Sequence, residues 1–187
     1  LYQKLPPLAQ ITALDREELT PVPDENSFCI LPSVSGEGHQ VLISPDTATC
    51  RDCFADISDP QNRRFEYPFT NCTNCGPRYT ITHSIPYDRE KTSMSCFPMC
   101  PDCDQEYNNP LDRRFHAQPN ACPLCGPKIW LTDHRGQRIC PDSSALTETV
   151  KALIQGQTAA IKGLGGFHLA CDASNEYAVQ RLRSRKN

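Results

Sequence analysis

The arrangement of cysteines constrains this chain more than any other feature of its sequence. Eight of the twelve cysteines form four C-x2-C pairs, and eighteen residues separate the two pairs of each set. A C-x2-C pair turns the chain so that two thiolates converge, and two pairs supply the four soft ligands of a closed tetrahedral site. The sequence therefore predicts two structural zinc sites, the first from Cys50, Cys53, Cys72 and Cys75, and the second from Cys100, Cys103, Cys122 and Cys125.

The two cysteine sets belong to an internal repeat. Residues 50–77, the first copy, align without a gap to residues 100–127, the second copy. Because a whole unit is repeated, we expect each copy to close its own site, and the alternative is pairing across the copies, as in interleaved zinc modules. Besides cysteines, the copies share Asp52 and Asp102, Pro60 and Pro110, Arg63-Arg64-Phe65 and Arg113-Arg114-Phe115, and Gly76-Pro77 and Gly126-Pro127.

Two other interpretations of the cysteines compete with zinc. A disulfide framework is typical of secreted domains, but the paired spacing and the lack of a recognisable signal peptide favour metal and a reducing cytoplasm. Iron is the second alternative, because Cys122-Pro-Leu-Cys125-Gly126 resembles a rubredoxin knuckle. The first copy, Cys72-Thr-Asn-Cys75, lacks that proline. We expect Cys29, Cys96, Cys140 and Cys171 to be ordinary thiols.

Charge and composition limit the partners and the source of stability. The formal net charge is -3, and two sites of four thiolates around Zn²⁺ would each add -2, so the loaded protein would carry about -7 (-3 - 2 - 2). This balance argues against a nonspecific nucleic-acid surface, and we see no apolar run that could span a membrane. Residues 50–127 hold few large aliphatic side chains. Metal binding would supply the missing free energy, about 10 kcal/mol for a structural zinc.

The rest of the chain divides around the two copies. We expect residues 1–35 to end a preceding domain, with a strand through Leu8, Ile11 and Leu14 and extended pieces at Phe28 to Ile30 and Val41 to Ile43. A linker would cover residues 36–49, a connector residues 78–99, and a further domain residues 128–187.

The last segment has an alternating pattern of helix and strand. We predict a strand at 128–132, a polar turn at 133–136, and a helix from Ala145, capped by Ser143 or Ser144 and stopped at Gly156. A buried strand at 158–161, a glycine-rich turn at 162–168 and a helix capped by Ser174 or Asn175 follow. The expected fold class is α+β: an irregular, metal-stabilised tandem zinc-finger module followed by the start of an α/β domain.

Several of these motifs together resemble the HypF family, the carbamoyltransferases that mature nickel-iron hydrogenases. The resemblance rests on the doubled cysteine module, on Ser44-Pro45-Asp46-Thr47-Ala48-Thr49-Cys50, and on Lys162-Gly-Leu-Gly-Gly-Phe-His-Leu-Ala-Cys-Asp172. It implies an acylphosphatase-like domain before the zinc fingers, then a YrdC-like domain and a C-terminal transferase domain. On this basis the chain would be a fragment that is inactive by itself, with no catalytic residue.

The resemblance also implies a reaction. Carbamoyl phosphate would be hydrolysed, the carbamate would be activated by ATP to carbamoyl-adenylate, and the carbamoyl group would pass to the C-terminal cysteine of a partner maturation protein. YrdC-like domains bind nucleotide through a P-T-D-T-x-Y-G-L segment and a K-x-R motif. Lys162 and His168 lie where the first motif belongs, with Lys162 replacing its proline and His168 its glycine, and Lys186 begins the second motif. The resemblance therefore implies that Lys162, His168 and Lys186 bind nucleotide.

Some residues and functions keep competing interpretations. Arg63, Arg64, Arg113 and Arg114 could steer an anionic substrate, or they could brace the thiolate clusters and pair with Asp52 and Asp102. His83 and His116 are expected to be surface histidines, because four cysteines already fill each site. The alternative functions are a zinc-dependent, chaperone-type protein-binding module and a tRNA-modifying YrdC relative.

Overall fold

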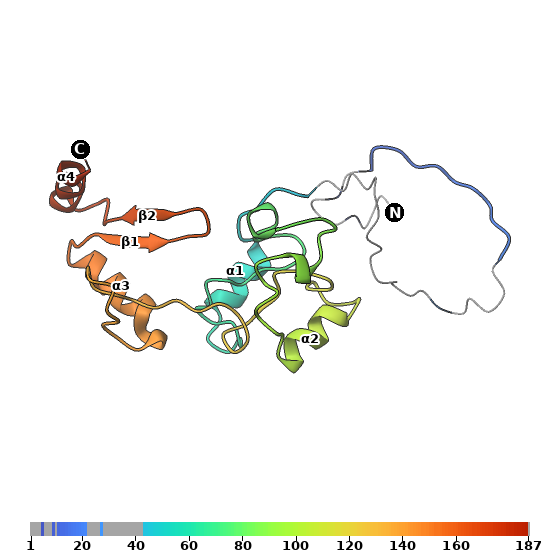
Figure 1. The fold of residues 1–187 in the computed structure, drawn as a ribbon, viewed down its shortest axis with the longest axis horizontal. Coiled ribbons are helices and arrows are strands. Elements are labelled where there is room, and N and C mark those ends of the chain that lie inside the picture. Colours follow the sequence, from blue (N-terminus) through green and yellow to red (C-terminus); the bar gives the residue numbers. More distant parts are fainter. Residues whose placement is uncertain (1–4, 6–8, 10, 22–26, 28–42, 187) are drawn as a thin grey trace. The chain divides into compact units, whose positions relative to one another are not determined.

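The computed structural model describes residues 5, 9, 11–21, 27 and 43–186, and these residues form two compact units, Leu1–Cys122 and Pro123–Asn187 (Figure 1). The extended pieces predicted at Leu8, Phe28 to Ile30 and Val41, together with Cys29, lie outside the described residues. The predicted limits of the domains, fingers and linker therefore remain predictions.

The strand predicted through Ile11 and Leu14 is wrong for the residues that can be described. Residues 11–21 form no strand, and Leu14 is 57% exposed. A strand needs a neighbour to satisfy its backbone groups, and none pairs with this segment within the described ranges. The apolar spacing alone therefore does not produce a strand here.

The first unit contains two short helices that the sequence pattern did not predict. They are α1, Arg51–Ser58, and α2, Pro101–Asn108 (Figure 1). Each begins directly after the first cysteine of its copy, and Cys50 and Cys100 are N-caps with the same extended backbone, φ -73° with ψ 165° and 164°. Each helix buries only its one cysteine, Cys53 or Cys103, so it shows no apolar period that could reveal it.

The chain follows the same course after both helices. The carboxylate of Asp59 accepts from the backbone of Gln61, and Asn109 accepts from Leu111 in the same way. Glu66 and His116, at matching positions, both take a positive φ, 56° and 50°. The sequence repeat is therefore also a structural repeat. Two 3₁₀ turns, Tyr79–Ile81 and Arg89–Lys91, lie in the connector between the copies.

Apolar packing in the first unit is slight. Its buried cluster consists of Tyr67, Ile81, Met94 and Ala121, with Phe97 packed against it. A large share of its fully buried volume is polar instead, and Arg64 and Asn120 are the largest of these side chains. The described interior of this unit is therefore largely polar.

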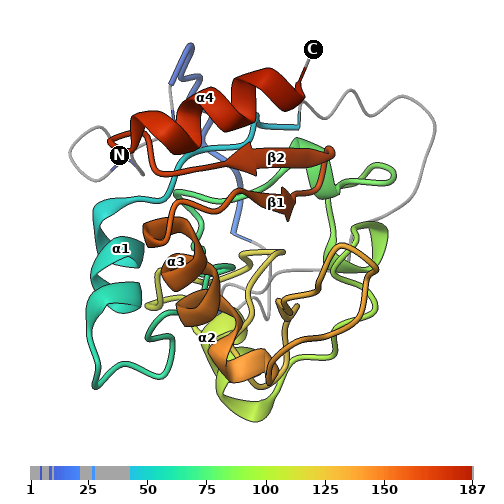
Figure 2. The ribbon, with the colours of Figure 1, turned by 90° about the vertical axis from the view of Figure 1, so that its left-hand side faces the viewer.

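The second unit contains α3, Ala145–Ile154, β1, Ala159–Lys162, β2, Phe167–Ala170, and α4, Glu176–Arg185 (Figure 2). A 3₁₀ turn, Asp142–Ser144, leads into α3, whose N-cap is Ser144. Gly156 has φ +76° directly after the helix, as expected for a glycine stop. The Asn175 side chain accepts from the backbone of Ala178 and caps α4, as predicted.

Three predictions in the second unit are wrong. The strand predicted at 158–161 forms as β1, but it is not buried, since Ile161 is 48% exposed. The glycine-rich turn is shorter than expected, because Phe167 and His168 belong to β2, which pairs antiparallel with β1. The strand predicted at 128–132 is reduced to one bridge between Thr132 and Arg138, although the turn at 133–136 forms. A single bridge cannot sustain a strand, since an isolated pair of strands is marginal in water. In the part of the chain that is described, no helix is both long and apolar enough to cross a bilayer.

Candidate metal centres

The eight cysteines predicted as ligands come together in two clusters. Site 1 contains Cys50, Cys53, Cys72 and Cys75, and site 2 contains Cys100, Cys103, Cys122 and Cys125. Within each site the sulfur atoms all lie within 4.8 Å of one another. Each copy therefore gathers its own four thiols, and the structure does not support pairing across the copies.

The sulfur spacing fits a tetrahedral metal site. The Sγ atoms of Cys50 and Cys72 are 3.7 Å apart, those of Cys72 and Cys75 are 3.8 Å apart, and those of Cys100 and Cys122 are 3.7 Å apart. Zn–S bonds of about 2.3 Å place the sulfurs of a tetrahedron about 3.8 Å from one another. A disulfide needs about 2.05 Å between its sulfur atoms, so these separations of 3.7 to 3.8 Å are too long for one. The two sites therefore fit structural zinc.

Local structure aims the thiolates of site 1 inward. Cys53 lies in the first turn of α1, where the partial positive charge of the helix N-terminus favours a thiolate. In the second knuckle, the backbone N–H of Asn74 lies 3.3 Å from the Cys72 sulfur. Gly76 has φ +94°, as expected for the residue after this knuckle, whereas Gly126 is not among the described glycines with positive φ.

Four thiolates so close together cannot all stay ionised without a cation. The Cys53 thiol donates a hydrogen bond to the Cys72 sulfur, which lowers the pKa of Cys72 and raises the pKa of Cys53. Burial also raises the pKa of Cys75. A divalent metal removes this conflict, because it replaces the shared protons and holds all four sulfurs as thiolates.

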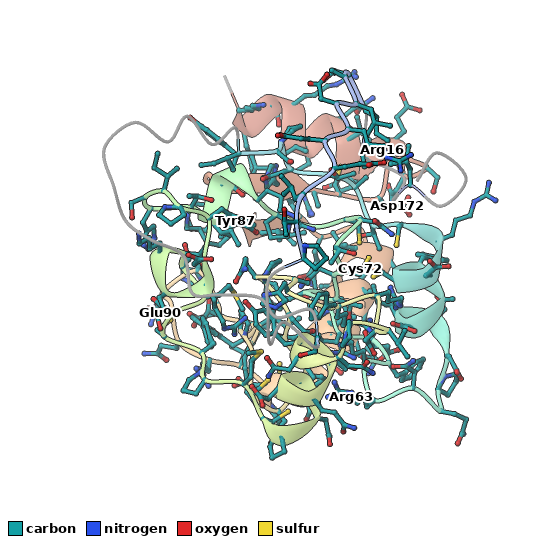
Figure 3. The ribbon with its side chains drawn as sticks, turned by 90° about the vertical axis from the view of Figure 1, so that its right-hand side faces the viewer. Arg16, Arg63, Cys72, Tyr87, Glu90 and Asp172 are labelled. Carbon is teal, nitrogen blue, oxygen red and sulfur yellow. The ribbon has the colours of Figure 1, made fainter. Side chains whose placement is uncertain are left out.

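Two arginines of the first copy bind the second copy. Arg63 places Nη2 3.4 Å from the Cys103 sulfur and 2.7 Å from the Glu106 carboxylate, and Figure 3 shows it beside α2. Arg64 is only 2% exposed and donates to both oxygens of Glu106, at 2.9 and 2.6 Å. Its Nε donates to the carbonyl of Ala121 at 2.9 Å. These arginines therefore contact a ligand and an acidic residue of the opposite finger.

The arginines of the second copy make matching contacts with the first copy. Arg113 donates to the Cys53 sulfur at 2.9 Å, and both Arg113 and Arg114 donate to the carboxylate of Asp56 on α1. The Nε of Arg114 donates to the carbonyl of Asn71 at 3.1 Å. Figure 3 shows Cys72 of the same site beside α1. We call these two reciprocal sets of contacts the arginine bridges, and they match the bracing interpretation rather than substrate steering.

The arginine bridges hold Glu106 in its charged form. Burial raises the pKa of this carboxyl group, but hydrogen bonds from Arg64 and Arg63 outweigh burial and lower the pKa to about 2. Guanidinium groups bind carboxylates in a fixed, bidentate geometry, and they remain charged in proteins. The bridge is therefore ionic across the physiological range.

Asp56 and Glu106 were missed as functional residues. They occupy matching positions, three residues after the second cysteine of their copies, and an acidic residue in both copies was the signal that could have revealed them. The predicted pairing with Asp52 and Asp102 is weaker. Arg63 lies 3.9 Å from the Asp102 carboxylate, and Arg113 contacts the carbonyl oxygen of Asp52 at 3.5 Å.

The other candidate residues around the fingers stay outside the clusters. His83 is exposed and lies 3.2 Å from the Ser93 hydroxyl. His116 is also exposed, and its ring lies 4.4 Å from the ring of Phe115. Cys96 is exposed and donates to the carbonyl of Ser93. Neither histidine belongs to a metal-binding group of the described residues.

The hairpin separates two of the three residues proposed for nucleotide binding. Lys162 is paired with Phe167 across the strands, and its Nζ lies 5.5 Å from the centre of that ring. His168 is paired with Ile161, one register position away. Adjacent positions of a strand face opposite sides, so Lys162 and His168 lie on opposite faces of the hairpin. Lys186 is the C-cap of α4.

Comparison with known proteins gives the same organisation. A family model described as "HypF finger" matches residues 49–82 and 99–132, and a Sua5/YciO/YrdC model described as "Telomere recombination" matches residues 151–187. These matches and the two four-cysteine sites define a tandem zinc-finger module followed by the start of a YrdC-like domain.

Sequence relatives and solved structures then identify the family. The chain is 54% identical over 187 residues to carbamoyltransferase HypF2 of Cupriavidus necator, and 49% identical over 186 residues to the probable carbamoyltransferase HypF of Methanocaldococcus jannaschii. It belongs to the HypF family. The matches cover 100% and 99% of this chain but 23% and 24% of the relatives, so the chain spans about a quarter of their length.

Two solved HypF structures agree with this assignment. A crystal structure of full-length HypF in the phosphate- and nucleotide-bound form matches with a TM-score of 0.71 at 50% identity, over 80% of this chain and 19% of that one. The T. kodakarensis HypF structure matches with a TM-score of 0.72 at 51% identity, over 79% of this chain and 19% of that one.

Proposed function

We propose that this chain is the structural zinc module, with the start of the YrdC-like domain, of a carbamoyltransferase that matures nickel-iron hydrogenases. The observation that carries the proposal is the whole-chain identity to proteins named carbamoyltransferase HypF, joined to two closed four-cysteine sites. That identity favours this function over a chaperone-type binding module or a tRNA-modifying enzyme. The protein acts in the cytoplasm, where a reducing environment keeps thiols available for metal.

The whole enzyme uses carbamoyl phosphate and ATP and passes through carbamoyl-adenylate. It transfers the carbamoyl group to the C-terminal cysteine of a partner maturation protein, where the group becomes the cyanide ligand of iron. The zinc module contributes no reacting group, because four protein thiolates fill each site and leave no open position for substrate. Its role is to hold a fixed structure within the larger enzyme.

The eight cysteines of sites 1 and 2 hold the two zinc ions. Zinc, when bound, supplies the cross-link that closes each copy, which has too small an apolar core to fold by burial alone. The chain's own residues do the rest. Arg63 and Arg113 donate to ligand sulfurs, and Glu106 and Asp56 hold the arginines in position.

Lys162, His168 and Lys186 contribute to the nucleotide site of the whole enzyme. All three are exposed, so their polar groups are accessible to a ligand. Because Lys162 and His168 lie on opposite faces of the hairpin, they have different roles. Lys162 offers its ammonium group to a phosphate. His168 packs toward the turn, where it lies against Gly163. A Cβ at position 163 would lie 3.2 Å from the His168 ring nitrogen, so a larger residue there would shift the ring by a few tenths of an ångström.

A segment exchange tests the function. The chain replaces its matching segment in the Cupriavidus necator relative, and the purified chimera is assayed for zinc content and for ATP cleavage that depends on carbamoyl phosphate. We expect two zinc ions for this module and retained activity. Cys53→Ser should lose one zinc and the activity, whereas the control Cys96→Ser, at an exposed cysteine outside both clusters, should lose neither. A zinc-loaded chimera without activity would contradict the assignment.

A further inference from the structure

The arginine bridges join each zinc site to the loop of the opposite copy. Arg63 and Arg64 lie in the first copy, between its two cysteine pairs, yet they contact Cys103 and Glu106 of the second. In the same way, Arg113 of the second copy contacts the Cys53 sulfur of the first. Each copy therefore supplies the cations that surround the other copy's thiolates.

These contacts should stabilise bound zinc, because they bring positive charge to a negatively charged site. A zinc ion with four thiolates carries a net charge of about -2. A guanidinium that donates to a ligand sulfur compensates part of that charge and fixes the orientation of the ligand. Removal of such an outer partner typically lowers metal affinity about 10- to 100-fold. Arg63 should therefore support metal at site 2, and Arg113 should support metal at site 1.

The position of each arginine depends in turn on its own site. Arg63 and Arg64 lie on the loop between Cys53 and Cys72, and zinc at site 1 closes that loop by binding both of its ends. Without metal the loop loses its cross-link, because the apolar core of the unit is small. The arginines of an empty copy are then no longer held against the other copy.

We propose that the arginine bridges make the two zinc sites cooperative, so that zinc at either site raises the affinity of the other. The inference rests on zinc filling both sites, as proposed above. The coupling is reciprocal, since an effect of site 1 on site 2 requires an equal effect of site 2 on site 1. It also assigns Arg63 and Arg113 as positioning residues for the metal centre of the opposite copy.

The first test counts zinc ions per molecule. The intact chain is equilibrated with zinc buffered by a chelator, and native mass spectrometry measures the species with no, one and two zinc ions. Two independent, equal sites give about half of the molecules with one zinc at half-saturation, whereas tenfold coupling lowers this share to about one quarter. We expect the smaller share. A share of one half or more would overturn the proposal.

The second test asks which copy each arginine serves. Zinc-loaded Arg113→Gln and Arg63→Gln are treated with a thiol-alkylating reagent, and the modified cysteines are mapped by peptide. Arg113→Gln should speed alkylation of Cys53 and its site 1 partners about tenfold relative to site 2, and Arg63→Gln should do the reverse. Each variant is the control for the other, and Arg135→Gln, at an exposed arginine of a turn, should change neither site.

The outcomes separate the two proposals. Failure of the chain to bind any zinc would overturn the zinc module itself. Two bound zincs with statistical loading, or faster alkylation in the variant arginine's own copy, would overturn only the coupling. If an arginine variant fails to fold, the zinc count of the unchanged chain still decides the question.

Discussion

The two units of this protein differ in the size and polarity of the side chains that they bury. The first buries arginines between carboxylates and thiolates, with Arg64 and Arg114 among its least exposed residues. In the second, Val150 and Ile154 of α3 are 46% and 71% exposed, and the buried side chains are the small ones of Ala145 and Ala178. The first unit therefore depends on metal and charge, whereas the buried side chains of the second do not include its larger aliphatic residues. Where large buried aliphatic side chains are scarce, the first unit fills its interior with directed polar contacts around two four-cysteine sites.

Metal removal should produce the largest difference in stability between the two units. Chelation of zinc should remove about 10 kcal/mol per site from the first unit, which has only a small apolar core to replace it. Hydrogen exchange of the intact chain should show faster exchange throughout α1 and α2. The amides of β1, β2 and α4 should change little. An equal response of both units would contradict the distinction.

Loss of a buried arginine should cost more than loss of an exposed ion pair. Arg64→Ala removes two hydrogen bonds to Glu106, which keeps Arg63, and leaves the buried carbonyl of Ala121 without this donor, so it should destabilise the first unit by about 3 kcal/mol. Lys151→Ala breaks the exposed pair with Glu148 on α3 and should cost about 0–1 kcal/mol. Denaturant unfolding of the zinc-loaded proteins measures both changes. Equal costs would show that the arginine bridge contributes no more than a surface pair.

The Glu106 bridge should weaken in acid. Its pKa is about 2 in the folded protein against an ordinary value of 4.5, so the unfolded state binds more protons between these values. The stabilisation, on the order of 3 kcal/mol, is present above pH 4.5 and is lost as the pH falls toward 2. The difference in unfolding free energy between the unchanged chain and Glu106→Gln should shrink over that range. A difference independent of pH would contradict the ionic bridge.

The smallest expected effect comes from the removal of one methyl group in each unit. Ile81 is 2% exposed in the core of the first unit, and Ile154 is 71% exposed at the end of α3. Ile81→Val should cost about 1 kcal/mol, and Ile154→Val should cost close to nothing. Thermal unfolding of the two variants is the measurement. A larger loss from Ile154→Val would show that α3 buries its apolar face in solution.

Local signals in the sequence predicted the structure best. The C-x2-C spacing gave all eight cysteines and their division between two clusters, and the caps Gly156 and Asn175 were found at their predicted places. The sequence pattern failed for α1 and α2, because a helix that buries one cysteine shows no period. It also failed for β2, because glycines that indicate a turn do not show where the returning strand begins.

The two four-cysteine clusters, the repeat and the family resemblance can all be read from the sequence, since each consists of residue types at fixed spacings. The partners of the arginines become visible only in the three-dimensional structure. Arg63 and Cys103 lie far apart in the chain, and the same spacing would allow Arg63 to brace either copy. A contact between distant residues depends on how the two copies pack, and the local sequence pattern does not predict that packing. The reciprocal bridges therefore follow from the three-dimensional fold alone.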